Sequence, residues 1–172
     1  MARATFGAGC FWYPQHFYDQ IPGVTETQVG YMGGTKPQPT YEEVCHAPTG
    51  HAEVIQVDYD PTLVSYDELL ELFWRMHDPA QIDGQGDDAG SQCRSVIFVH
   101  EDGQAAAART SKEAEAASGR HDGPITTTIL PAQKFWVAED YHQKYFARLD
   151  RPSVFALLSE KLSDWLARRK SS

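Results

Sequence analysis

The chain has 172 residues, of which 41% are hydrophobic and 23% are charged, and its formal net charge is −9. This length and composition predict one soluble globular domain over residues 1–172, with a frayed basic tail at about 168–172. The acidic balance argues against nucleic acid or an anionic membrane as a partner, and no apolar run approaches the ~18 residues of a membrane span. No signal peptide is recognised, and we expect a cytoplasmic monomer.

The three cysteines stand at scattered positions, Cys10, Cys45 and Cys93. An odd number at such spacing argues against a disulfide framework and against a CxxC metal knuckle. We therefore predict a reducing compartment and no bound metal. In a reduced protein, a cysteine at a selected position is more often chemical than structural.

Strands and helices are predicted to alternate along the chain without a linker. The apolar and β-branched patterns predict strands at 2–8, 24–32, 51–59, 94–100 and 125–130. Helical spacing predicts helices at 10–18, from 66 to near 77, at 101–118, and around Leu158, Leu162 and Trp165. Ser65 and Glu68 form a capping box before the second of these. This alternation predicts a two-layer α/β or α+β sandwich.

Cys10 is the most informative residue because it lies where the first strand gives way to the first helix. The free N–H groups of a helix start favour a thiolate over a thiol. Gly9 lets the backbone turn sharply there and leaves the sulfur uncovered. A buried structural cysteine is the alternative, since cysteine is among the most buried residue types.

Several side chains are candidates to lie near Cys10. Glu53, near the start of the strand 51–59, places a carboxyl at a sheet end, and alternation puts it on the same face as Ile55 and Val57. A surface salt bridge is the alternative for Glu53. The Gly- and Asp-rich segment 84–92 is of the kind that lines sites, although it lacks the spacing of an EF-hand. Phe17 and Tyr18, by contrast, read as core residues.

Six motifs in order resemble those of the class A peptide methionine-S-sulfoxide reductases, over about residues 5–147. They are G-C-F-W at 9–12, G-Y-M-G-G at 30–34, T-Y-E-E-V-C at 40–45 with T-G-H-A-E at 49–53, H-D-P at 77–79, Q-G-D-D-A-G-S-Q at 85–92 and A-E-D-Y-H-Q at 138–143. The resemblance implies an α+β fold of the ferredoxin-like kind, a two-layer sandwich with a mixed sheet and peripheral helices.

The resemblance also implies a reaction and assigns residues to it. Cys10 would attack the sulfur of methionine sulfoxide and become a sulfenic acid, with Glu53 as the general acid. Tyr41 would hydrogen-bond the sulfoxide oxygen, and Phe11 and Trp12 would hold the methyl group. Asp88 matches an aspartate that holds a water in the site. No bound cofactor is implied, and the reductant would be an external thiol, thioredoxin or a small molecule.

The chain departs from the family pattern in three places. Cys93 replaces a tyrosine that would donate a second hydrogen bond to the sulfoxide, and no resolving cysteine follows it. Tyr13-Pro14-Gln15 replaces the usual Gly-Val-Glu and reshapes the helix. Cys93 is a possible resolving cysteine and Cys45 a weaker one. We favour direct recycling by an external thiol, because a preformed pair would compete with substrate entry.

Two other functions stay open on the sequence alone. A cysteine hydrolase would use Cys10 with His51 or His142, and would need an imidazole next to the sulfur. A binding protein would recognise oxidised methionine without turnover, since one tyrosine is missing. A reduction assay driven by dithiothreitol separates all three.

Overall fold

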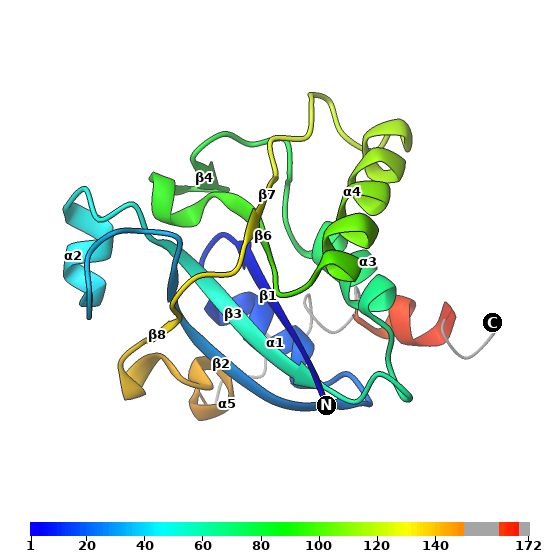
Figure 1. Ribbon diagram of the computed structural model, residues 1–172, viewed down its shortest axis with the longest axis horizontal. Coiled ribbons are helices and arrows are strands. Elements are labelled where there is room, and N and C mark those ends of the chain that lie inside the picture. Colours follow the sequence, from blue (N-terminus) through cyan, green and yellow to red (C-terminus); the bar gives the residue numbers. More distant parts are fainter. Residues whose placement is uncertain (150–161, 169–172) are drawn as a thin grey trace.

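The computed structural model describes residues 1–149 and 162–168. Six strands form one sheet (Figure 1) in the order β7 (Thr128–Pro131), β6 (Ser95–Val99), β1 (Ala2–Ala8), β3 (Ala52–Tyr59), β2 (Val24–Met32) and β8 (Trp136–Val137). The helices are α1 (Trp12–Tyr18), α2 (Tyr41–His46), α3 (Tyr66–Met76), α4 (Asp102–Ala117), α5 (Tyr145–Arg148) and a helix at 162–168. Short elements complete the described chain: the hairpin of β4 (Gly84–Gln85) and β5 (Asp88–Ala89), and the 3-10 turns η1 (Ser91–Cys93) and η2 (Asp140–His142).

The sheet is mixed, because β6 and β7 run parallel while the other strand pairs of this sheet, among the described residues, are antiparallel. The parallel step is made by α4, which connects the two strands along one side of the sheet. In the pairing of β1 with β6, the register runs from Thr5 opposite Phe98 to Ala8 opposite Ser95. The expected α+β class with a mixed sheet is therefore confirmed.

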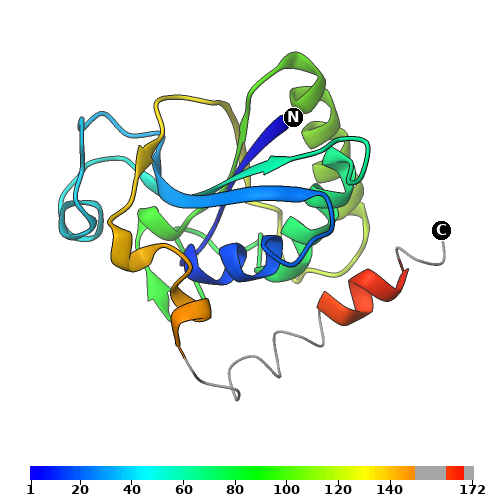
Figure 2. The same cartoon turned by 90° about the horizontal axis from the view of Figure 1, so that it is seen from below.

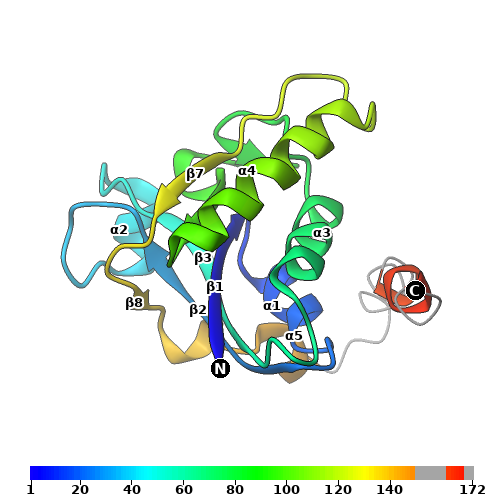
Figure 3. The ribbon, with the colours of Figure 1, turned by 45° about the vertical axis from the view of Figure 1, so that its right-hand side comes forward.

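The two faces of the sheet are covered by different elements of the chain. One face packs Phe6, Ile55 and Ile97 against α1, α3 and α4 in the larger core, and Figures 2 and 3 show these helices gathered on one side. The other face packs Val54 and Phe98 against the extended segment that holds Leu130 and Phe135. Because β3 is central and both faces are covered, its residues are buried on both sides, although the predicted alternation holds.

The predicted strands at 2–8 and 24–32 have the observed bounds, and the Ser65–Glu68 capping box is present. The first helix begins at Trp12 rather than Cys10, because Gly9 turns the chain with a φ of +85° and Phe11 is the N-cap. The strand predicted from residue 125 begins at Thr128. Its preceding Thr126 is bonded instead to the carbonyls of Pro79 and Gln81.

The C-terminal prediction is met in part. Leu162 and Trp165 are buried in the larger core, whereas Leu158 lies outside the described residues. Of the tail expected at about 168–172, Arg168 is still helical, and 169–172 lie outside the described residues. The helix α2 was not predicted, although Thr40 and Glu43 form a second capping box at its start. Within residues 1–149 and 162–168, no helix is long and apolar enough to cross a membrane.

Candidate active site

The backbone at Gly9 brings Cys10 to the end of the sheet. Its φ of +85° is in the region that favours glycine. A Cβ at this position would lie 2.6 Å from the Cβ of Gln85, so only glycine fits under that side chain. Gln85 is itself fixed by two hydrogen bonds to the backbone of Asp78, at 2.7 and 2.8 Å. The loop that carries Asp88 is therefore packed directly against the residue before the cysteine.

A cavity of about 360 Å³ opens at Cys10. Its lining contains six of the seven residues that the sequence assigned to the site. The described lining residues are Cys10, Trp12, Tyr13, Tyr41, Glu53, Asp87, Asp88, Ala89, Gln92 and Cys93. The seventh, Phe11, is 1% exposed and supports the wall from behind, in a small core with Tyr31 and Val44. The sequence therefore identified a set of residues that the fold brings together.

Glu53 is a buried carboxyl that lines the same cavity as Cys10, and no cation among the described residues is bonded to it. Its side chain is 3% exposed, and Oε2 accepts a hydrogen bond from the backbone N–H of Phe11 at 3.2 Å. Burial raises the pKa of Glu53 to about 7; the Phe11 N–H opposes this shift and the charge of Asp88 adds to it. A group with this pKa holds a proton for part of the time at neutral pH, as a general acid must.

The thiol of Cys10 is less acidic than the sequence suggested. Burial raises its pKa to about 12, and the negative charges of Glu53 and Asp88 add to this. The backbone N–H of Trp12, at the helix start, lowers the pKa as expected but does not outweigh burial. The helix start therefore favours the thiolate as expected, but burial and the nearby carboxylates outweigh it, so the net pKa of Cys10 is raised.

Trp12 forms a fixed aromatic wall. Its indole N–H donates to Nδ1 of His142 at 3.1 Å, and its ring stacks on Tyr145 with centroids 3.8 Å apart and planes 9° apart. His142 is 1% exposed and its ring also contacts Phe11 and Tyr41. The sequence named His142 only as a possible base. Its position in the A-E-D-Y-H-Q motif was the available signal.

Tyr41 is held in place by a carboxylate that the sequence did not single out. Glu139 accepts from the backbone N–H of Tyr41 and from the hydroxyl of Tyr31, both at 2.8 Å. The Glu139 side chain thus connects α2 to β2. Tyr31 and Glu139 lie in two of the motifs quoted above, G-Y-M-G-G and A-E-D-Y-H-Q, but no local pattern links two positions that are 108 residues apart.

The other two cysteines lie on different sides of this arrangement. Cys93 ends the turn η1, is 3% exposed and lines the cavity with Cys10. Cys45 lies on α2, one turn after Tyr41, and burial raises the pKa of its thiol. Cys45 is not among the described lining residues. All three cysteines are free.

Neither histidine of the hydrolase alternative is next to the sulfur. The Nδ1 of His51 accepts from the N–H of Gly34 at 3.0 Å, and its Nε2 lies 2.8 Å from the carbonyl of Lys36. His142 is committed to Trp12. Among the described residues that line the cavity there is no histidine. A Cys–His pair on Cys10 therefore does not form in this geometry.

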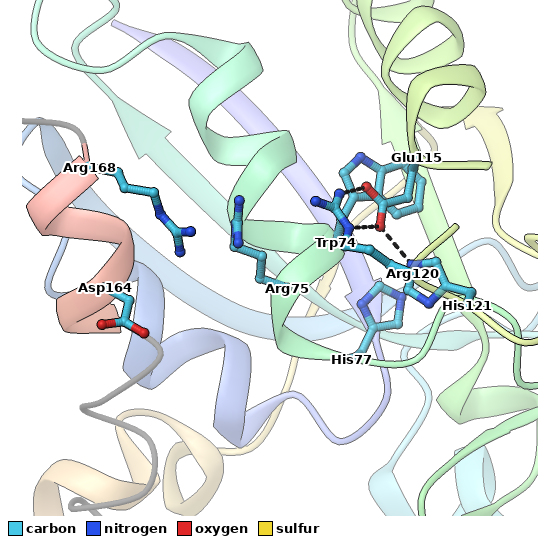
Figure 4. A pocket seen from close by; sticks show the side chains of 8 residues that line it. All are labelled: Trp74, Arg75, His77, Glu115, Arg120, His121, Asp164 and Arg168. Carbon is cyan, nitrogen blue, oxygen red and sulfur yellow. Dashed lines mark hydrogen bonds and ion pairs between the residues drawn. The ribbon is translucent and has the colours of Figure 1, made fainter. Parts of the chain in front are cut away.

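A second cavity, of about 340 Å³, lies between α3, α4 and the helix at 162–168. Figure 4 shows Glu115 there, between Arg120 and His121. Its side chain is 4% exposed and forms an ion pair with Arg120, while Nε2 of His121 lies 2.6 Å from Oε1. Burial raises the pKa of Glu115, but the bonds from Arg120 and His121 outweigh it, so the net pKa is lowered.

In the part of the chain described here, no group of three or more His, Cys, Asp or Glu is placed to hold a metal.

An α+β fold that gathers a thiol, a proton-bearing carboxyl and an aromatic wall in one cavity defines a thiol enzyme. Comparison with known proteins gives the family. The model of the family described as peptide methionine sulfoxide reductase matches residues 2–171. A relative from Geobacter sulfurreducens, "Peptide methionine sulfoxide reductase MsrA", is 55% identical over 148 residues, which are 86% of this chain and 91% of the relative.

Solved structures agree with this assignment. The reduced form of Mxr1 from Saccharomyces cerevisiae has a TM-score of 0.80 at 34% identity, covering 86% of this chain and 84% of that one. Mxr1 in complex with Trx2 has a TM-score of 0.59 at 27% identity, covering 84% of each chain. The chain therefore belongs to the peptide methionine sulfoxide reductase family, as the motifs predicted. It is an oxidoreductase that reduces methionine sulfoxide to methionine with a thiol as the source of electrons.

Proposed function

We propose that Cys10 is the nucleophile of this reaction and Glu53 its general acid, acting on the S epimer of methionine sulfoxide, free or in proteins. The Cys10 thiolate attacks the sulfoxide sulfur and forms an S–S bond to it, while the sulfoxide oxygen takes the Glu53 proton. The hydroxyl then passes from the substrate sulfur to the Cys10 sulfur as the S–S bond and the substrate S–O bond break. Methionine leaves, and Cys10 carries the oxygen as a sulfenic acid. The observation that carries this proposal is the shared cavity, in which Glu53 faces Cys10 with a pKa of about 7 and no cation beside it.

The walls of the cavity support the remaining roles. Trp12, fixed by His142 and Tyr145 and backed by Phe11, offers an apolar surface to the methyl group of the substrate. Tyr41 places its hydroxyl in the cavity to bind the sulfoxide oxygen. Asp88, on the exposed side of the cavity, would hold a water there. With Cys93 in place of a tyrosine, Tyr41 is the one tyrosine hydroxyl left for the oxygen among the family positions.

We propose further that thioredoxin reduces the oxidised enzyme, and the complex of Mxr1 with Trx2 supports this choice over a small thiol. No bound cofactor is needed for the steps above. The match of the family model to residues 2–171 supports one domain over residues 1–172. The order β6-β1-β3-β2, with α1 and α3 as the crossovers, supports the ferredoxin-like class. A monomer in the cytoplasm stays our prediction.

Reduction of a methionine sulfoxide peptide, driven by dithiothreitol, tests the roles of Cys10 and the reductant together. We expect turnover for the wild type and none for Cys10→Ser, because an alcohol presents almost no anion near neutral pH. Binding without turnover in the wild type would support the binding protein instead. Ester or amide cleavage without any reductant would support the hydrolase.

A further inference from the structure

We propose that Cys93 is the resolving cysteine of this enzyme, and that it closes a disulfide with Cys10 inside the active-site cavity after each turnover. This inference rests on the proposed role of Cys10 as the nucleophile. It reverses the preference that the sequence alone supported, because the fold brings both cysteines into the lining of one cavity.

Cys10 and Cys93 both lie just beyond the ends of the paired strands β1 and β6. The pairing ends with Ala8 opposite Ser95, and each cysteine lies two residues beyond its member of that pair. There the backbone leaves the ladder, since Gly9 has a φ of +85° and Cys93 lies in the turn η1. A disulfide needs Cα atoms roughly 4.4–6.8 Å apart, so the proposal requires these two strand ends to come within that range.

Close packing keeps the strands together up to that point. A Cβ built on Gly7 would lie 3.3 Å from the carbonyl oxygen of Arg94 and 3.1 Å from that of Glu53. Only glycine at this position allows so close an approach. Beyond it, Cys10 and Cys93 both line one cavity. Cys45, on α2, is not among the described residues that line this cavity.

The chemistry balances without a further reactant. The Cys93 sulfur attacks the Cys10 sulfenic sulfur, an S–S bond forms, the S–O bond breaks and the oxygen leaves as water. Glu53, left as a carboxylate by the reductase step, takes the Cys93 proton and returns it to the departing hydroxide. The two electrons that reduced the substrate thus come from the two thiols, and thioredoxin restores them afterwards.

A single turnover without reductant tests the proposal. Reduced wild-type enzyme, with its three free thiols, is mixed with excess methionine sulfoxide peptide. We then count methionine formed, thiols remaining and the enzyme's mass. The matched variants are Cys93→Ser, Cys93→Tyr, which restores the family residue, and Cys45→Ser. Tryptic mapping separates the pairs, because the bond from Lys36 to Pro37 resists cleavage and leaves Cys10 and Cys45 on one peptide, while Cys93 lies on another.

We expect one methionine per enzyme, one thiol remaining and a mass lower by two hydrogens, with the Cys10 and Cys93 peptides cross-linked. Cys45→Ser should keep the cross-link. Both Cys93 variants should still form one methionine but gain one oxygen, at a sulfenic Cys10. A wild type that forms methionine yet keeps Cys93 free, or that joins Cys10 to Cys45, overturns the inference and leaves the proposed function standing. A wild type that forms no methionine overturns the proposed function itself.

Discussion

Glu53 and Glu115 are two buried glutamates of nearly equal exposure, 3% and 4%, at opposite sides of the core. Burial raises the pKa of both. Glu115 has Arg120 and His121 as bonded partners, and its net pKa is lowered. Glu53 has a single backbone N–H and the negative Asp88, and its pKa is raised to about 7. Burial alone therefore does not decide the net pKa of a buried carboxyl. Bonded cationic partners lower it at Glu115, and no such partner among the described residues opposes burial at Glu53.

The comparison distinguishes a buried carboxylate that is paired with cations from one that is not. A paired carboxylate stays ionised over the physiological range and contributes to the stability of the fold. An unpaired one in a dry cavity changes its protonation near neutral pH, which costs stability but allows proton transfer. Replacing glutamate with glutamine should therefore slow the reaction at Glu53 and lower the stability of the fold at Glu115.

The largest expected effect is on the rate of Glu53→Gln. The amide keeps the shape of the side chain but has no acidic proton, so the reductase step should slow by roughly 10²–10⁴-fold while the fold remains. Single-turnover formation of methionine measures the rate, and thermal unfolding checks the fold. Near wild-type rates at neutral pH would remove Glu53 from the role of acid.

Glu115→Gln is the matched control, with its effect on stability instead. Loss of the charge leaves His121 and the half-exposed Arg120 with a weaker partner, which should cost about 1–3 kcal/mol of unfolding free energy. The rate of the reductase step should not change. Since the folded pKa is lowered, the contribution of Glu115 is present above its unfolded pKa and is lost as the pH falls through the folded pKa. Urea unfolding at neutral and at acid pH should show the difference from wild type shrinking.

Trp12 in the active-site cavity and Trp74 in the second cavity extend the comparison to aromatic side chains. Trp12→Ala should weaken binding of methionine sulfoxide by roughly 1–3 kcal/mol through lost apolar contact. Trp74, which donates to Ser111 at 2.8 Å in the second cavity, is the control, since Trp74→Ala should lower the melting temperature without changing KM. Should Trp12→Ala instead lower only the melting temperature, its role is to support the core.

The smallest expected effect is the shape of the pH profile. The proposed reaction requires that Cys10 and Glu53 together hold one proton. That proton is on Glu53 when Cys10 attacks as a thiolate, and the total is the same when the proton is on Cys10 and Glu53 is a carboxylate. With pKa values of about 7 for Glu53 and about 12 for Cys10, the singly protonated pair becomes dominant above pH 7. The single-turnover kcat/KM should therefore rise as the pH increases through about 7 and then level off. In Glu53→Gln this lower limb should disappear, and its persistence would assign it to another group.

Local patterns predicted much of this fold. The bounds of β1 and β2 and the Ser65–Glu68 capping box depend on residues close in sequence, and all three are observed. Ordered motifs likewise identified the residues of the cavity. Glu139, which joins Tyr31 to Tyr41, and the partners of Glu115 were not found. Glu139 makes its contacts with segments that are distant in sequence. Glu115 is a buried residue on α4, a helix that the sequence predicts to lie at the surface.

The same limit explains why the net pKa of Cys10 was not predicted. The start of α1 was visible in the sequence, and its Trp12 N–H lowers the pKa of the thiol as expected. The burial of the thiol and the nearby Glu53 and Asp88 were not visible, because they come from strands and loops placed there by the fold. An electrostatic environment is a property of the assembled site.

The contacts of Trp12 with His142 and Tyr145 join the beginning of the chain to its late segments. On the ribosome, Cys10 is therefore made long before the residues that hold Trp12. At about 5–20 residues per second, the interval between Cys10 and Tyr145 is on the order of 10 s. Throughout that time the nascent chain has a Trp12 ring without these two contacts. The proposed methyl-binding surface is complete only after Tyr145 has been added.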